Sequence, residues 1–89
     1  MVNASPTFTC PVCGWPGLKR LPYRGRVPSF ETCPCCGFEF GFHDYDQGWT
    51  FDAYRKEWIA RGMIWHWPPG QAPEGWDPIA QIRRLEEKS

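Results

Sequence analysis

The chain has 89 residues, enough for one compact domain whose core is too small to be stable without help from a metal or from crosslinks. Ten Lys and Arg balance ten Asp and Glu, which excludes a whole-molecule attraction to nucleic acid or to an anionic membrane. Six Trp, six Phe and three Tyr beside ten Pro and nine Gly predict a loop-rich fold in which a few large side chains account for most of the burial.

The sequence carries no recognisable sorting or membrane signal. The start, "MVNASPTFTC", has no basic segment followed by an apolar stretch, and apolar runs elsewhere are only a few residues long. We therefore expect a cytoplasmic protein with no membrane partner. In that reducing compartment cysteine pairs bind metal more often than they form disulfides, and five cysteines leave one unpaired in any intrachain disulfide scheme.

Two matched motifs, "CPVCG" and "CPCCG", predict a metal site. Cys10 and Cys13 form one C-x-x-C pair, Cys33 and Cys36 form the other, and 19 residues separate the pairs, which is a zinc-ribbon spacing. Zn(II) prefers four tetrahedral ligands, and two residues between cysteines let one tight turn present two thiolates to the same ion. We predict one Zn(II) per chain on these four thiolates. Iron is the alternative metal, because it accepts the same geometry.

The fifth thiol, Cys35, occupies the variable position of the second motif, where the first motif has Val12. One interpretation is a small apolar side chain packed under the loop, since free cysteine is among the most buried residue types. The other is a redox-sensing thiol or an alternative metal ligand, because a thiolate near a metal is reactive. We favour the packing role.

The segment 15–32 between the motifs predicts a hairpin of two short extended runs around a turn that contains Pro or Gly. It is basic, with no acidic residue before Glu31. Its cations are Lys19, Arg20, Arg24 and Arg26. With Tyr23 or Trp15 as a stacking platform, they support a competing hypothesis of weak nucleic-acid binding.

The segment after the second motif is acidic and aromatic. In "FEFGF", Phe38, Phe40 and Phe42 alternate, which predicts a strand with one aromatic face. The next stretch, "HDYDQGWTFD", does not have the glycine and glutamate positions of a calcium-binding EF-hand loop. Its carboxylates are expected in a turn that leads to a helix capped by Thr50 or Asp52.

The helix predicted within "TFDAYRKEWIARG" has an aromatic stripe expected to pack on the ribbon. The stripe consists of Phe51, Tyr54 and Trp58, and Gly62 is placed to end the helix. A short extended run, "MIWHW", should follow, and then "PPGQAPEG" as an irregular connector.

A second helix is predicted in "DPIAQIRRLEEK". Asp77 is its expected N-cap and Pro78 its first residue. The expected buried side consists of Ile79, Ile82 and Leu85. The two histidines, His43 and His66, are expected on the surface or at an interface, because four cysteines already complete a tetrahedral site. No catalytic constellation is recognisable, so we do not expect an enzyme.

Five segments together resemble the small bacterial cysteine-rich proteins named for their "CPCC" motif. They are "TCPVCGWPGL", "FETCPCCGFEFGFHD", "YRKEWIARG", "IWHWPP" and "GWDPIAQIRRL". This resemblance implies a fold and a metal rather than an activity. The cysteine motifs also resemble the "CxxCG" and "CPxCG" knuckles of rubredoxin, whose iron carries one electron. The stretch between the motifs is shorter and more basic than in rubredoxins, and the helical second half has no counterpart there.

The expected fold is a small metal-stapled α+β domain over residues 1–89, with a zinc ribbon at about 8–45 and a two-helix extension with a Pro-rich connector at 50–88. The expected function is a non-enzymatic zinc-binding module for protein interaction, either an adaptor or a neutralising partner. Trp65, Trp67 and Trp76 are expected on its contact surface, or else they clamp the last helix onto the ribbon. The alternatives are a nucleic-acid-binding ribbon and a rubredoxin-type electron carrier.

Overall fold

The computed structural model describes residues 6–87. Two of the predictions above extend beyond this range. The absence of a secretory signal concerns residues 1–5 among others, and the second helix was expected to include residue 88; both of these parts lie outside the described residues.

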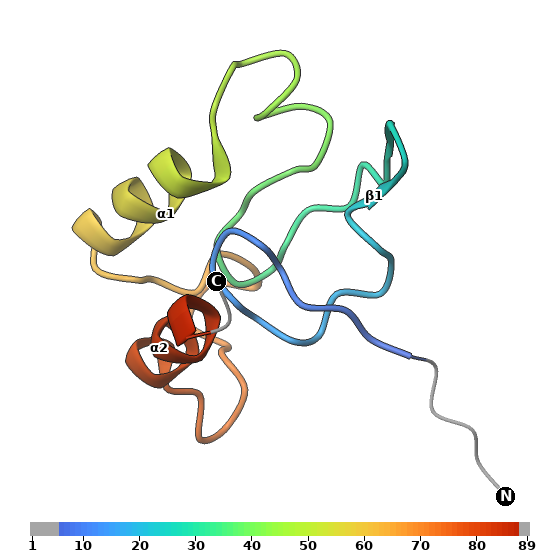
Figure 1. The fold of residues 1–89 in the computed structure, drawn as a ribbon. Helices are drawn as coiled ribbons and strands as arrows, with labels where there is room; N and C mark the ends of the chain where they lie inside the picture. Colours follow the sequence, from blue (N-terminus) through green and yellow to red (C-terminus); the bar gives the residue numbers. More distant parts are fainter. Residues whose placement is uncertain (1–5, 88–89) are drawn as a thin grey trace, which may run out of the picture.

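The fold is a small α+β arrangement dominated by turns. Two short strands, β1 (Tyr23–Arg24) and β2 (Val27–Pro28), precede two helices, α1 (Phe51–Ala60) and α2 (Pro78–Glu87). In Figure 1 the helices lie on one side of the molecule and the hairpin on the other, with irregular chain between them. The buried side chains come from both the irregular chain and the helices, and they are Cys10, Val12, Cys13, Leu18, Cys33, Cys35, Cys36, Phe38, Phe40, Tyr54, Trp58, Trp65, Gln81 and Ile82.

The predicted hairpin between the cysteine motifs is present. Strands β1 and β2 pair antiparallel, with Tyr23 opposite Pro28 and Arg24 opposite Val27. Gly25 begins the connecting turn with a φ of 63°, a left-handed conformation that matches the twist of a tight hairpin and that glycine adopts without strain.

The strand predicted in "FEFGF" is wrong. Only Glu39 forms an isolated bridge, to Thr32, and the chain then turns. Phe38 and Phe40 still exchange main-chain hydrogen bonds with residues 30–33, but the N–H groups of Phe42 and His43 donate to the carbonyl of Glu39, at 3.2 and 3.1 Å. This turn ends the pairing before a regular strand forms. Phe38 and Phe40 are buried, whereas Phe42, within the turn, is exposed.

Helix α1 begins and ends where the sequence predicts. The Thr50 hydroxyl accepts a hydrogen bond from the N–H of Ala53 at 3.0 Å, which identifies Thr50 as the N-cap. After the helix, Gly62 has a φ of 101°, as expected for a residue that ends a helix. Tyr54 and Trp58 are buried, so the aromatic stripe belongs to the core.

Helix α2 also begins as predicted, because the Asp77 carboxylate accepts a hydrogen bond from the N–H of Ala80 at 3.1 Å. Its buried face differs from the prediction. Ile82 is buried and Leu85 half-buried, but Ile79 is 55% exposed and Gln81 is buried instead. Positions 78, 81, 82 and 85 form one stripe at helical spacing, and Ile79 lies outside it.

The segment "MIWHW" forms no strand. Residues 63–65 are irregular, and a turn follows at 66–70. The indole N–H of Trp58 donates to the carbonyl of Ile64 at 2.9 Å, so this segment packs back against α1. The connector at 68–75 is irregular, as predicted.

Candidate metal centre

The two cysteine motifs fold into the same turn. In the first, the N–H of Gly14 donates to the carbonyl of Cys10; in the second, the N–H of Gly37 donates to that of Cys33; both bonds are 2.8 Å long. Gly14 and Gly37 have φ values of 88° and 85°. Glycine is needed there because other residues adopt such angles only with strain. Two copies of one local turn thus present four cysteines.

The hairpin between the motifs brings these copies face to face. The sulfur atoms of Cys10, Cys13, Cys33 and Cys36 all lie within 4.8 Å of one another. The Sγ atoms of Cys10 and Cys36 are 3.9 Å apart, and those of Cys13 and Cys33 are 3.8 Å apart. A regular tetrahedron with Zn–S bonds of roughly 2.3 Å has S···S edges of about 3.8 Å. The cluster therefore has the size of a four-thiolate metal site.

The electrostatics of the cluster also fit a cation. All four side chains are buried, and all five cysteines of the chain are free thiols. Burial raises the pKa of the Cys13 and Cys36 thiols, because a buried thiolate loses its hydration and meets the other thiolates. Four thiolates can be buried together only with a compensating positive charge, which a bound dication provides.

Helix α1 supports the first cysteine loop through Arg55. Its Nε donates to the carbonyl of Val12 at 2.6 Å, and its Nη2 donates to the carbonyl of Pro11 at 2.9 Å. Asp52, one turn earlier on the helix, accepts a bond from Nη1 at 3.3 Å and helps to orient the guanidinium group. The planar fork of Arg55 thus satisfies the two carbonyls within the first C-x-x-C motif.

The second loop receives the equivalent support from main-chain groups. The N–H of His66 lies 3.0 Å from the carbonyl oxygens of both Pro34 and Cys35, and the N–H of Trp67 donates to Pro34 at 2.9 Å. The turn at 66–70, which replaces the predicted extended run, therefore holds the metal-site loop.

Sequence reasoning missed Gln81, which links helix α2 to both loops. Its Nε2 donates to the carbonyl of Cys13 at 2.9 Å and lies 3.4 Å from the sulfur of Cys35. Its Oε1 accepts a hydrogen bond from the indole N–H of Trp76 at 3.0 Å. The sequence did contain one indication of this role, because Gln81 lies on the same helical stripe as the buried Ile82. A glutamine on a buried stripe needs hydrogen-bond partners on the element that it faces.

Cys35 is buried in the second loop, as Val12 is in the first. It is not one of the four cysteines whose sulfur atoms lie within 4.8 Å of one another. Hydrogen bonding from Cys13 and, to a smaller degree, from Gln81 lowers the pKa of the Cys35 thiol. Complete burial is what the packing interpretation requires, because an exposed thiol would be needed for ready attack by an oxidant.

The tryptophans predicted on a contact surface divide into two groups. Trp65 is buried, which corrects that assignment, and its ring meets those of Trp15 and Trp76 edge to face, at centroid distances of 5.5 and 5.3 Å. Trp65 and Trp76 thus act as the alternative clamp between the last helix and the first cysteine loop. Trp67 is exposed.

The histidines also differ from each other. His43 is half-buried, and its Nδ1 accepts a hydrogen bond from the N–H of Glu39 at 2.9 Å. His66 is exposed and lies over the second loop, where a Cβ on Gly37 would come within 2.8 Å of its Nδ1. Neither histidine belongs to the sulfur cluster.

The carboxylates near the predicted basic segment accept hydrogen bonds from groups other than its Lys and Arg side chains. The two oxygens of Glu31 accept hydrogen bonds from the main-chain N–H groups of Lys19 and Arg20, at 2.9 and 3.0 Å. The Tyr23 hydroxyl donates to Asp44. Tyr23 and the other expected stacking residue, Trp15, are half-buried rather than open platforms.

Within residues 6–87, no helix is long and apolar enough to cross a membrane. No family model and no solved structure matches the chain. The chain is 39% identical to the uncharacterized protein YoaQ of Bacillus subtilis strain 168, over 64% of this chain and 61% of YoaQ. It is 38% identical to the uncharacterized protein YozI of the same strain, over 63% of this chain and 60% of YozI. The match thus spans about three fifths of the length of each relative.

Proposed function

We propose that this protein is a zinc ribbon in which Cys10, Cys13, Cys33 and Cys36 hold one Zn(II). The observation that carries the proposal is the set of four buried sulfur atoms within 4.8 Å of one another, two pairs of which are 3.9 and 3.8 Å apart. Zinc bound there would supply positive charge and a crosslink between the two loops. The resemblance of these loops to rubredoxin knuckles and to the "CPCC" proteins supports the same assignment.

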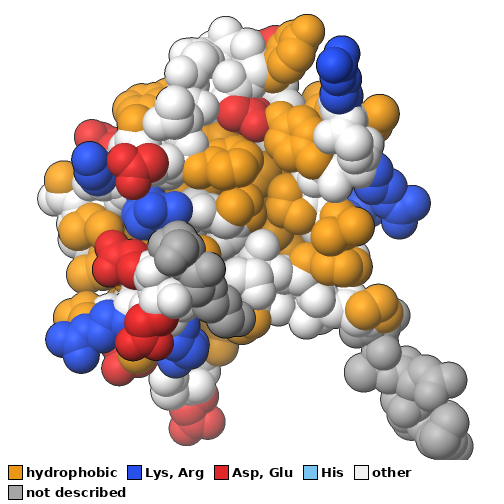
Figure 2. Space-filling view, in the orientation of Figure 1, with side chains coloured by type: hydrophobic (Ala, Val, Ile, Leu, Met, Phe, Trp, Pro, Cys, Tyr) orange, Lys and Arg blue, Asp and Glu red, His pale blue; other side chains and the backbone are white. Residues whose placement is uncertain are grey.

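A site with four protein thiolates leaves no open coordination position, and this is the arrangement of structural rather than catalytic zinc. We therefore propose a non-enzymatic role, as a cytoplasmic protein-interaction module that acts as an adaptor or a neutralising partner. Exposed apolar side chains support this role. Phe30 and Tyr45, which line one hollow with Pro28, are 62% and 83% exposed. In Figure 2, hydrophobic side chains gather over the middle and upper part of the face in view.

The metal is tested by elemental analysis of protein purified without added metal. We expect one zinc per chain, and cobalt substitution should give the sulfur-to-metal charge-transfer bands of a tetrahedral thiolate site. Iron in the purified protein, with a reversible one-electron couple, would instead identify an electron carrier. A preparation that keeps its thermal unfolding transition after complete metal removal would contradict the structural role.

The interaction role is tested by photo-crosslinking in the cells that make the protein. A photoreactive side chain is placed in turn at Arg24, Phe30, Tyr45 and Trp67, with Lys56, on the polar side of α1, as the control. We expect discrete protein adducts at one group of neighbouring positions and none at residue 56. If no position gives more adduct than the control, the interaction role is wrong.

A further inference from the structure

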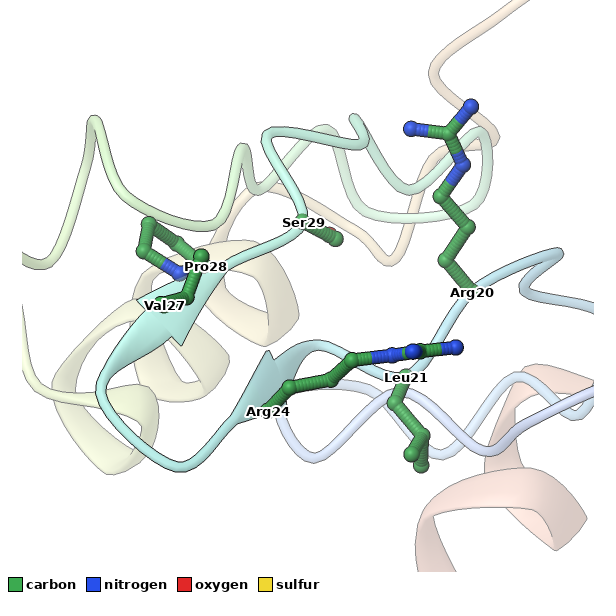
Figure 3. A pocket seen from close by; sticks show the side chains of 6 residues that line it. All are labelled: Arg20, Leu21, Arg24, Val27, Pro28 and Ser29. Atoms are coloured by element: carbon green, nitrogen blue, oxygen red, sulfur yellow. The ribbon is translucent and has the colours of Figure 1, made fainter.

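The hairpin carries a hollow that combines cations with aliphatic side chains. It measures about 330 Å³ and is lined by Arg20, Leu21, Arg24, Val27, Pro28 and Ser29. In Figure 3 the side chain of Arg24 runs across Leu21, Arg20 extends from the neighbouring segment, and Val27–Ser29 forms the other border. Leu21 is 43% exposed and Val27 is 65% exposed, although both are apolar.

The two guanidinium groups have no protein partner among residues 6–87. Glu31 follows the hairpin, but both of its oxygens accept main-chain hydrogen bonds. Asp44 is likewise occupied, by the Tyr23 hydroxyl and by main-chain N–H groups. The hollow therefore presents positive charge that the chain itself does not pair, even though the net charge of the whole protein is zero.

The lining distinguishes between two classes of anionic partner. A single-stranded nucleic acid needs aromatic rings on which its bases stack, and none lines this hollow. Tyr23, the aromatic residue within the hairpin, is half-buried and its hydroxyl is bonded to Asp44, and the exposed Phe30 that follows the hairpin lines a different hollow. The hollow places aliphatic side chains beside guanidinium groups. A partner that alternates carboxylates with aliphatic groups matches this lining, and an acidic protein segment has that chemistry.

We propose that residues 20–29, here called the arginine hairpin, are the docking surface for an acidic segment of a partner protein that also carries aliphatic side chains. Carboxylates of that segment pair with Arg20 and Arg24, and its aliphatic groups cover Leu21 and Val27. This inference rests on the proposed interaction function and names the chemistry of the partner.

The test uses the isotope-labelled, zinc-loaded protein and a short peptide that alternates Glu and Leu, titrated at low salt and followed by amide chemical shifts. We expect the shift changes to concentrate in residues 20–29. The double variant Arg20→Ala/Arg24→Ala should weaken binding about tenfold, because it removes two partly exposed ion pairs. The matched control, Arg83→Ala/Arg84→Ala on α2, removes the same charge and should change the affinity by less than about twofold.

Four outcomes would overturn the proposal. They are shift changes centred away from the arginine hairpin, equal loss of affinity in the control variant, equal binding of a Glu and Gly peptide without aliphatic groups, and tighter binding of oligothymidylate to the same residues. The charge-reversal variant Arg24→Glu changes the charge by the same two units and should weaken binding by about tenfold as well, while keeping the amide spectrum of a folded protein. Crosslinked partners at Phe30, Tyr45 or Trp67 but not at Arg24 would refute the hairpin as the docking surface and leave the interaction role standing.

Discussion

The side-chain amide of Gln81 donates a hydrogen bond to the main-chain carbonyl of Cys13 across 68 positions of sequence, at 2.9 Å. The same side chain accepts a bond from Trp76 and lies against the sulfur of Cys35. One buried amide thus joins helix α2, the connector before it and both cysteine loops. The docking of α2 and the geometry of the four-cysteine cluster are therefore coupled through this residue.

Replacing Gln81 by Leu should destabilise the zinc-loaded protein by about 1 to 3 kcal/mol, because the change leaves the carbonyl of Cys13 and the indole N–H of Trp76 without partners in a buried site. Urea unfolding at constant zinc concentration measures this. Gln71→Leu, at an exposed position of the connector, is the control and should cost less than about 0.5 kcal/mol. Equal effects of the two changes would refute the coupling.

The parts of this fold that were predictable are those fixed by neighbours in sequence. Each cysteine loop depends on a glycine four positions after its first cysteine. Each helix depends on a capping residue, Thr50 for α1 and Asp77 for α2, that lies three positions before the N–H group that it binds. Local chemistry of this kind is visible in the sequence.

The side chains that hold the cysteine loops in place were not predictable in this way. Arg55 reaches carbonyls 43 and 44 positions away, and Gln81 reaches one 68 positions away. Both residues are ordinary surface residues by type, and only the tertiary packing buries Gln81 and partly buries Arg55. The strand predicted at 38–42 failed for a related reason: alternating phenylalanines are compatible with a strand, but nothing in the pattern shows that the Glu39 carbonyl closes a turn.

The Arg55 support gives a second prediction. Arg55→Ala removes both hydrogen bonds to the first loop and should cost about 2 kcal/mol, since bonds from a charged donor to partly buried carbonyls contribute more than neutral ones. Arg55→Lys should recover only part of this, because an ammonium group lacks the planar fork. Thermal unfolding of the zinc-loaded variants provides the comparison.

The control for Arg55 is the adjacent Lys56→Ala. Lys56 also pairs with Asp52, at 3.3 Å, but its side chain is highly exposed, so its loss should change the stability by less than about 0.5 kcal/mol. The role assigned to Arg55 would be wrong if removing it were no more costly than removing Lys56.

The three cysteines of the second motif should respond differently to replacement. Cys35→Val places in the second loop the residue that the first loop has at Val12, so zinc content should stay at one per chain, with a cost of at most about 1 to 2 kcal/mol. Cys33→Ser or Cys36→Ser removes one of four thiolates, and zinc affinity should fall sharply with loss of the fold. Elemental analysis of the variants purified side by side measures the difference.

Loss of zinc from the variant at position 35, with retention in either neighbour, would show that the ligand set is assigned wrongly. Unchanged zinc at position 35 combined with altered sensitivity to peroxide would instead favour the redox interpretation of Cys35. The packing interpretation requires that peroxide release zinc from the wild type and from Cys35→Val at the same rate.

The bond from Tyr23 to Asp44 predicts a pH dependence of stability at each end of the scale. Partial burial alone raises the pKa of Asp44, but hydrogen bonds from the Tyr23 hydroxyl and from main-chain N–H groups outweigh it and hold this pKa below its ordinary value. Because the folded state favours the carboxylate, the stabilisation is present above the ordinary Asp pKa of about 3.9 and is lost as the pH falls through the depressed one.

The pKa of Tyr23 shifts in the opposite direction, since partial burial and the Asp44 carboxylate raise it to about 12. Its stabilisation is present below the ordinary Tyr pKa of about 10 and is lost as the pH rises through the folded value. Subtracting the unfolding free energy of each variant from that of the wild type isolates this pair from all other titrations. Because each group shifts the pKa of the other, the difference for Asp44→Asn and that for Tyr23→Phe should each shrink towards both the acid and the alkaline end. A difference that is independent of pH in both variants would mean that the hydroxyl and the carboxylate are not bonded in solution.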